Sequence, residues 1–247
     1  MPAEAVLQFF FAAIVLVVAY AVRGTTGFGG QAIAVPLLAL IMPLQVVVPA
    51  ITALTALSSF TYWRRDRNKI AWGEILRLLP FTLLGVLAGL YVFQRVDPAT
   101  LTRAFGVFVI LYALFSLRRA EAPARPPRHA RVIGSVLSTI SGALGAIFGA
   151  AAGPLYVIYF NLLQYEKEAF RATVTTILMF QALARIAGYA QLGFYDNTVL
   201  LLIVAGLPLM LIGARLGGML GGRINQFWFD RCVAALLLVS GVALLVK

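Results

Sequence analysis

Residues 23–36 read RGTTGFGGQAIAVP, and this short stretch interrupts a chain that is otherwise strongly apolar. Glycine and proline are poor helix formers, so we expect a helix to break here. Inside a bilayer no water satisfies exposed backbone groups, and irregular backbone is tolerated only where protein buries it or where it lines a cavity. The stretch therefore predicts an interrupted membrane helix at a place that matters for function.

The composition of the chain is that of an integral membrane protein. Of the 247 residues, 62% are hydrophobic and only 12% are charged. A soluble domain of this length has too little interior to hide so much apolar surface. The formal net charge is +11, but most cations lie in short gaps between apolar runs, which is typical of loops at an anionic membrane surface. We expect the lipid bilayer as a partner and no nucleic acid, because a nucleic-acid-binding face needs a water-facing domain.

Eight apolar runs are long enough to cross the hydrocarbon core as helices, which takes roughly 17 to 25 residues. They cover residues 5–22, 44–63, 70–93, 101–117, 132–148, 169–192, 198–220 and 227–246. Two shorter runs, 31–42 and 154–163, each follow a glycine-rich stretch and predict broken or re-entrant segments. The predicted fold class is an all-α polytopic membrane protein with eight long spans and two short segments.

The ten segments fall into two similar halves within a single membrane domain. A linker rich in arginine and proline, residues 118–131, separates repeat 1 (5–117) from repeat 2 (132–246). One constant offset places Gly24, Gly27 and Pro36 on Gly142, Gly145 and Pro154, and a slightly larger one places Pro80, Gly85, Gly89, Arg95 and Arg103 on Pro208, Gly213, Gly217, Arg223 and Arg231. Because five segments per half is an odd number, we expect the second half to enter the membrane from the opposite side, which makes the repeats inverted. The positive loop 64–69 and the linker are then cytoplasmic.

The second half repeats the opening interruption as SGALGAIFGAAAGP, residues 141–154. In inverted repeats, two such breaks are expected to meet near the middle of the bilayer, where many transporters bind their substrate. Glycine lets backbone amides approach a ligand closely, and the short helix after each break offers a positive N-terminal end, so the predicted substrate is an anion. For the scattered glycines we favour close helix packing instead; these are Gly85, Gly89, Gly213, Gly217 and Gly218.

Arg185 is the charge most deeply placed within a predicted span. It follows Gln181 by four residues, so both side chains share one helix face. A guanidinium matches the oxygens of an anion in bidentate fashion, and the alternative is a structural hydrogen-bonding role. Arg23 ends the first span beside the glycine stretch, with a cytoplasmic anchor as its alternative role. The candidate substrate-binding residues are Arg23, Thr25, Thr26, Gly27, Phe28, Gly29, Gly30, Gln31, Gly145, Phe148, Gly149, Gln181 and Arg185.

The segments GTTGFGGQAIAVPLLAL and SGALGAIFGAAAGP, together with the two-fold hydropathy repeat, resemble the sulfite exporter TauE/SafE family, also called the toluene sulfonate uptake permease family. The resemblance covers residues 5–246. It implies a small duplicated permease of the bacterial inner membrane that moves sulfite, sulfonates or related organosulfur anions. The sequence departs from the family pattern at Gln31, where a third glycine is common, and at Ala150–Ala152 after Gly149.

The placement of the acids and of the single histidine bears on the mechanism. All nine acids fall at span ends or in loops, and His129 lies in the linker. An intramembrane enzyme would need a base or a metal motif such as H-E-x-x-H, so we expect no catalytic residues, metal or cofactor. Without an intramembrane proton relay, we expect the anion to cross by alternating access as a uniport or to carry its own proton. The alternatives are an anion-selective channel and a carrier of another small anion such as a carboxylate.

Overall fold

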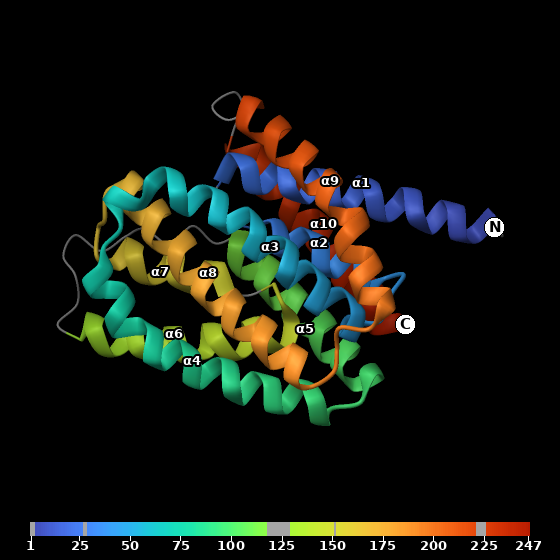
Figure 1. Ribbon diagram of the computed structural model, residues 1–247, viewed down its shortest axis with the longest axis horizontal. Coiled ribbons are helices and arrows are strands. Elements are labelled where there is room, and N and C mark those ends of the chain that lie inside the picture. Colours follow the sequence, from blue (N-terminus) through green and yellow to red (C-terminus); the bar gives the residue numbers. More distant parts are fainter. Residues whose placement is uncertain (1–2, 27–28, 118–128, 151, 221–225) are drawn as a thin grey trace. The chain divides into compact units, whose positions relative to one another are not determined.

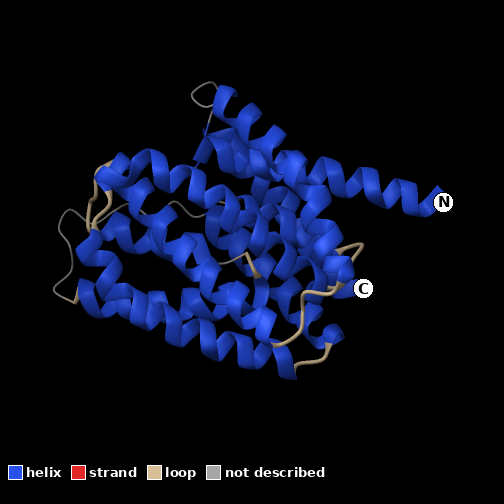
Figure 2. Ribbon diagram, viewed as in Figure 1, coloured by secondary structure: helices blue, strands red, loops and turns tan. Residues whose placement is uncertain are grey.

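The computed structural model of the chain describes residues 3–26, 29–117, 129–150, 152–220 and 226–247 (Figure 1). Within these ranges the regular structure is entirely helical, as the sequence predicted (Figure 2). The helices are α1 (Ala3–Thr26), α2 (Gly30–Ala39), α3 (Leu44–Asp66), α4 (Trp72–Arg95), α5 (Pro98–Leu117), α6 (Ala130–Phe148), α7 (Ala152–Leu162), α8 (Lys167–Gln191), α9 (Asn197–Leu220) and α10 (Gln226–Val246), with a 3-10 turn η1 (Arg67–Lys69) before α4.

Among the described residues, five helices are both long and apolar enough to cross a membrane: α1, α4, α5, α6 and α9. Shorter apolar stretches occur within α3 and α10, at Leu44–Phe60 and Val233–Val246. Helix α8 has 25 residues, which is a sufficient length, but its threonines and its buried Gln181 and Arg185 lower its hydropathy. The structure thus supports five of the eight predicted long spans, and the count of eight stays a prediction.

The two short segments are present where the sequence predicted them. Helix α2 has 10 residues and α7 has 11. At 1.5 Å per residue each is about 16 Å long, roughly half of the hydrocarbon core. Gly29 precedes α2 with φ 95°, and Gly149 follows α6 with φ 71°. Both values lie in the left-handed region that glycine adopts without a steric penalty, so a glycine marks each break.

The breaks are narrower than the sequence predicted. Helix α1 continues through Gly24 to Thr26, and α6 continues through Gly142 and Gly145 to Phe148. These glycines were expected within the interruptions and instead lie within regular helix. In a membrane the helical backbone hydrogen bonds have no competitor, so a few glycines alone do not end a helix there.

The chain forms two compact units, each assembled from both sequence halves. Unit 1 comprises Met1–Ile51, Val96–Arg119 and Asp196–Lys247, and unit 2 comprises Thr52–Arg95 and Ala120–Tyr195. In unit 1, α1 packs along α9, α5 packs along α10, and α2 contacts both α1 and α10. In unit 2, α4 packs along α6, while α8 contacts α4 and α7 contacts α6 and α8.

Small residues allow the main helix pair of each unit to approach closely. In unit 2, a Cβ on Gly85 or Gly89 would overlap the backbone of Thr139 or Ala143 on α6. In unit 1, a Cβ on Gly217 would likewise overlap the Ala21 backbone. These contacts confirm the packing interpretation of the scattered glycines.

Two further glycines refine this packing interpretation. Gly218 has no neighbouring atom within 4 Å of the place its Cβ would occupy, so a side chain would have space there, although its backbone nitrogen lies 3.1 Å from the place of a Cβ on Gly24. Gly24, which the sequence assigned to the first break, belongs to the seam instead, because its Cβ would lie 2.7 Å from the Ala214 carbonyl oxygen.

The two seams correspond to each other under the predicted repeat. That alignment matches α1 with α6 and α4 with α9, so the α4–α6 pair of unit 2 is the counterpart of the α9–α1 pair of unit 1. Glycines in equivalent positions, such as Gly89 and Gly217, face the partner helix in both pairs. The duplication of the chain and the inverted orientation of its halves stay predictions.

Candidate functional site

The first break lies in unit 1, between α1 and α2. Gly29 occupies the N-cap position of α2, and no side chain caps the helix. Gly30 begins α2 and is buried against α1, where its Cβ would lie 2.8 Å from the carbonyl oxygen of Ala19 and 3.1 Å from Cβ of Arg23. The short helix therefore starts in direct contact with the last turns of α1, at a distance that only glycine allows.

Arg23 is buried at this break, with 2% of its surface exposed. It lies in the last turn of α1, where the negative end of the helix dipole favours a cation. Such burial argues against the anchor role, which would place the guanidinium at the membrane surface. The hydroxyl of Thr25 donates to the carbonyl of Val22 at 2.7 Å and so belongs to the end of the same helix.

Gln31 completes the described part of the first break. Its side chain is 9% exposed, and Nε2 has no hydrogen-bond partner among the residues that the structure describes. It lies in the first turn of α2, where backbone amides have no partner within the helix. The side chain of Thr26 and the predicted site residues Gly27 and Phe28 lie outside the described part of the chain.

The second break lies in unit 2, between α6 and α7. Helix α6 ends at the buried Phe148, and the amide of Gly149 donates to the carbonyl of Gly145 at 2.9 Å. Gly145 was expected within the interruption but lies in the last turn of the helix. Its contribution to the site is its carbonyl oxygen, which accepts a hydrogen bond from Arg185 of α8.

Three side chains of α8 reach carbonyl groups in the last two turns of α6. Gln181 Nε2 donates to the carbonyl of Ser141 at 2.8 Å, and Arg185 Nη1 donates to the carbonyl of Gly145. Tyr189 donates to the carbonyl of Ala146 at 2.5 Å. The predicted common face of Gln181 and Arg185 is therefore confirmed. Sequence reasoning missed Tyr189, although it continues the same spacing of four residues.

The Arg185 guanidinium is a buried positive charge, and its side chain is 1% exposed. Ion pairs join Lys69 to Glu168 and Arg77 to Glu74, and neither pair involves Arg185. The carbonyl oxygens at the end of α6 carry partial negative charge and stabilise the cation in part. A full countercharge from the described protein is absent.

A buried set of hydroxyl groups lies between α4, α6 and α7 in the same unit. The hydroxyls of Tyr156 and Thr82 are 2.7 Å apart. Tyr156 is also close enough to Arg185 for an electrostatic interaction. In the loop after α8, burial raises the pKa of Tyr195 to about 12, and the charge of Arg185 opposes that rise. Phenol groups thus surround the guanidinium, and all of them are neutral near pH 7.

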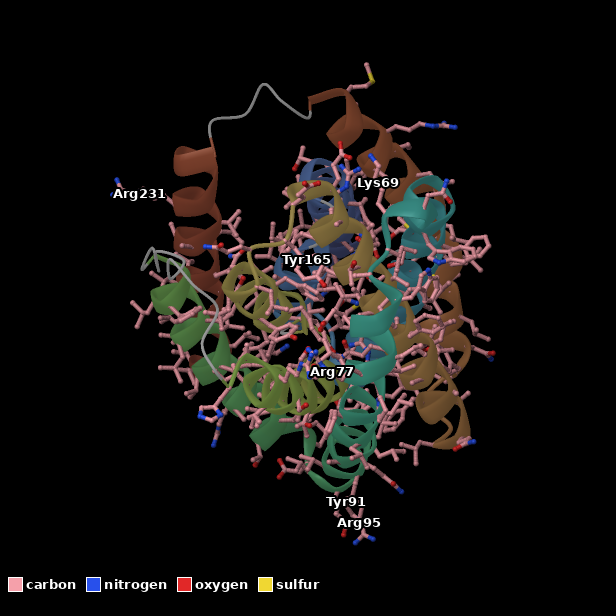
Figure 3. All side chains as sticks on the ribbon, turned by 90° about the vertical axis from the view of Figure 1, so that its left-hand side faces the viewer. Lys69, Arg77, Tyr91, Arg95, Tyr165 and Arg231 are labelled. Carbon is pink, nitrogen blue, oxygen red and sulfur yellow. The ribbon has the colours of Figure 1, made fainter. Side chains whose placement is uncertain are left out.

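A second polar cluster in unit 2 joins the beginning of α4 to α7. Glu74 pairs with Arg77, and the hydroxyl of Tyr159 donates to Glu74 Oε2 at 2.8 Å while also contacting Arg77. Figure 3 labels Arg77 and Tyr165 of this region. The ring of Tyr159 occupies the space that a side chain at Gly134 would need. In the adjoining loop the pKa of Tyr165 is raised, first by burial and then by the charge of Glu74. The cluster fixes α7 to α4, and sequence reasoning missed it.

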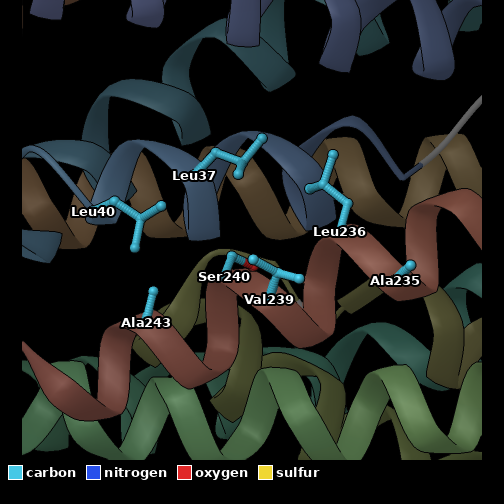
Figure 4. A pocket seen from close by; sticks show the side chains of 7 residues that line it. All are labelled: Leu37, Leu40, Ala235, Leu236, Val239, Ser240 and Ala243. Carbon is cyan, nitrogen blue, oxygen red and sulfur yellow. The ribbon is translucent and has the colours of Figure 1, made fainter.

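An apolar groove of about 360 Å³ lies between α2 and α10 in unit 1 (Figure 4). Its lining consists of Leu37, Leu40, Ala235, Leu236, Val239, Ser240 and Ala243. The hydroxyl of Ser240 donates to the carbonyl of Leu237 at 3.0 Å and is engaged within its own helix. Without a charged or free polar lining group, this groove does not suit an anion.

Comparison with known proteins agrees with this architecture. The family model described as "Sulfite exporter TauE/SafE" matches residues 11–244. A "Probable inner membrane transporter protein TsaS" from Comamonas testosteroni is 29% identical over 180 residues, which cover 72% of this chain and 73% of the relative. No solved structure matches the chain. The resemblance seen in the glycine motifs is thereby confirmed, and the chain belongs to the sulfite exporter TauE/SafE family of membrane transporters.

Proposed function

We propose that this transporter moves a small organosulfur anion, such as sulfite or a sulfonate, across the bacterial inner membrane, and that Arg185 is its principal anion ligand. The family description names a sulfite exporter, and the relative's name places that protein in an inner membrane. The family description supports the substrate class, and the relative's name supports the location. The choice of Arg185 rests on the burial of its charge in this chain.

The observation that carries the proposal is the buried charge of Arg185 without a carboxylate partner. An ion taken out of water costs several kcal/mol unless another charge or several hydrogen bonds compensate it. One guanidinium N–H reaches the Gly145 carbonyl, whereas Nε has no hydrogen-bond partner among the described residues. An oxyanion bound at this edge of the guanidinium would supply the missing charge and accept from Nε.

The first break offers a second place that attracts an anion, within unit 1. Arg23 is buried there, and the N-terminal turn of α2 carries Gln31 with an uncommitted amide nitrogen. Backbone amides and a positive helix end favour negative charge. We propose that the anion passes both breaks. That the breaks face each other, and that transport proceeds by alternating access, stay predictions.

The direct test is anion flux into proteoliposomes that contain the purified protein. We expect Arg185→Ala to reduce the uptake of sulfite about ten-fold or more, because a hydrogen bond to a charged group contributes roughly 1.5–3 kcal/mol. The matched control is Arg215→Ala, since Arg215 is exposed on α9, and we expect nearly unchanged flux. Sulfite uptake by folded Arg185→Ala at the wild-type rate would contradict the proposal.

A further inference from the structure

Several buried polar atoms of unit 2 lack a hydrogen-bond partner among the described residues, and two of them lie on one face of α8. These two are Oε1 of Gln181 and Nε of Arg185. Their side chains are at most 1% exposed. Most buried polar groups in proteins are hydrogen-bonded, so two open atoms on one helix face indicate a ligand position.

The hydroxyl groups of α6 have partners within the protein. Ser135 donates to the carbonyl of Arg131 at 3.2 Å, and Thr139 donates to the carbonyl of Ser135 at 3.1 Å. Such bonds to the preceding turn are the ordinary way in which a membrane helix satisfies a hydroxyl group. The buried Ser138 instead faces the hydroxyl of Tyr156 on α7.

The two open atoms lie at neighbouring levels along α6. Gln181 is fixed at the level of Ser141 and Arg185 at the level of Gly145, through their hydrogen bonds to those carbonyls. Four residues of helix rise about 6 Å, which a single small ligand can span.

The chemical character of the open atoms is mixed. The guanidinium Nε–H of Arg185 is a donor. The amide of Gln181 is oriented by its 2.8 Å bond to the Ser141 carbonyl, since only the NH₂ group can donate there. Oε1 of Gln181 is consequently an open acceptor beside an open cation. A sulfonate group has hydrogen-bond acceptors only, so it has no proton to donate to Oε1 of Gln181.

We propose that Gln181 is a specificity-determining residue, and that the site takes an oxyanion that keeps one proton, such as the O–H form of hydrogensulfite. Its O–H donates to Gln181 Oε1, and one of its remaining oxygens accepts from Arg185 Nε. This inference rests on the proposed function, because it specifies the anion that Arg185 binds. Both side chains are buried, so the anion reaches them only after part of unit 2 moves.

The protein groups near Arg185 do not titrate in the range where sulfite does. They are Tyr156 on α7, Tyr189 on α8 and Tyr195 in the following loop, and phenols ordinarily titrate near pH 10. The residues that face the site from α4 and α6, Thr82 and Ser141, carry no titratable group. A change in affinity near neutral pH therefore reports the protonation of the ligand.

The test compares the affinities of the purified protein for sulfite and for methanesulfonate, which has no proton to lose, across neutral pH by isothermal titration calorimetry. We expect the affinity for sulfite to fall as rising pH converts hydrogensulfite to the dianion, and the affinity for methanesulfonate to be lower and independent of pH. We expect Gln181→Met to weaken sulfite binding about ten-fold and to remove its preference over methanesulfonate. Gln191→Met, at an exposed position of the same helix, is the matched control and should behave as wild type.

The variants separate this inference from the proposed function. Arg185→Ala should weaken both anions, whereas Gln181→Met should change their ratio. The inference would be overturned if the wild type bound sulfite and methanesulfonate with equal affinity at every pH. It would also be overturned if Gln181→Met weakened the binding of both anions equally. Either result would leave the proposed function intact. Undiminished binding of both anions to Arg185→Ala would overturn the proposed function itself. The wild-type pH profile decides the matter even if a variant fails to fold.

Discussion

The two helix breaks share a backbone design and differ in how they hold their cation. Each break has a left-handed glycine, Gly29 with φ 95° or Gly149 with φ 71°, beside a short helix. Each also has a buried arginine, with Arg23 2% exposed and Arg185 1% exposed. Arg23 belongs to the helix that ends at its own break. Arg185 belongs to α8 and reaches back 40 residues to the Gly145 carbonyl.

This difference indicates what each break depends on. At the first break the close approach of α2 to α1, at Gly30, dominates the contacts. At the second, hydrogen bonds between α6 and α8 dominate, and several polar atoms remain open. We therefore expect the first break to be sensitive to side-chain size and the second to be sensitive to the loss of polar groups. The predictions below follow this contrast from the largest effect to the smallest.

The largest expected effect is that of Gly30→Val. Its Cβ would lie 2.8 Å from a backbone oxygen of α1, and a backbone atom moves aside less easily than a side chain. We expect a loss of about 3 kcal/mol of stability, seen as a much lower melting temperature in detergent or as failure to accumulate. Helix α7 begins with Ala152 in the sequence, whereas α2 begins with a glycine. Gly218→Val is the control, and equal melting of the two variants would contradict the prediction.

Tyr189→Phe probes the hydrogen bonds that distinguish the second break. The substitution removes the donor to the Ala146 carbonyl and leaves a buried acceptor at the end of α6. We expect a loss of about 1–2 kcal/mol in thermal unfolding. Tyr91→Phe is the matched control, since Tyr91 is 61% exposed on α4. Identical unfolding of both variants would mean that the α8 contacts do not hold this break together.

Gly149→Ala and Gly149→Asn test the backbone feature that both breaks share. A residue with a Cβ pays about 1–2 kcal/mol in the left-handed conformation, whereas asparagine tolerates it better. We expect Gly149→Asn to melt between the wild type and Gly149→Ala, and the same order at Gly29. If the alanine and asparagine variants melted at the same temperature at both positions, the left-handed conformation would not be the reason that glycine is required there.

The smallest effect is expected for Thr25→Val. The hydroxyl of Thr25 already donates to the Val22 carbonyl, so its donor is not open to a substrate. We expect a loss of about 0.5–1 kcal/mol of stability and a sulfite flux within about two-fold of wild type. A large drop in flux, with stability retained, would show that Thr25 contacts the anion in another conformation.

The sequence alone predicted the features that depend on local pattern. Glycine density and the two short apolar runs located α2 and α7, and the spacing of four residues placed Gln181 and Arg185 on one face. The sequence analysis overestimated the length of the breaks, because glycines such as Gly142 lie within regular helix and allow close packing against a neighbouring helix. Composition alone does not distinguish a glycine in such a contact from a glycine in a turn.

Contacts between residues far apart in the sequence could not be predicted. Glu74 and Tyr159 are 85 residues apart, and no local pattern pairs an acid at a helix start with one tyrosine among several. Open polar atoms could not be predicted either, because the sequence does not show which atoms of a buried amide are engaged. Only the structure shows that Nε2 of Gln181 donates to the Ser141 carbonyl while Oε1 has no partner among the described residues.

An experimental structure determined with selenite, the heavier analogue of sulfite, tests the central claim most directly. Data collected at the selenium absorption edge would locate the bound anion independently of the protein density. The account predicts one strong anomalous peak in unit 2, within hydrogen-bonding reach of Arg185 Nε and of the Gln181 side-chain oxygen. A peak elsewhere, with Arg185 bound only to the end of α6, would show that this arginine is a structural cap and that the anion binds at another place.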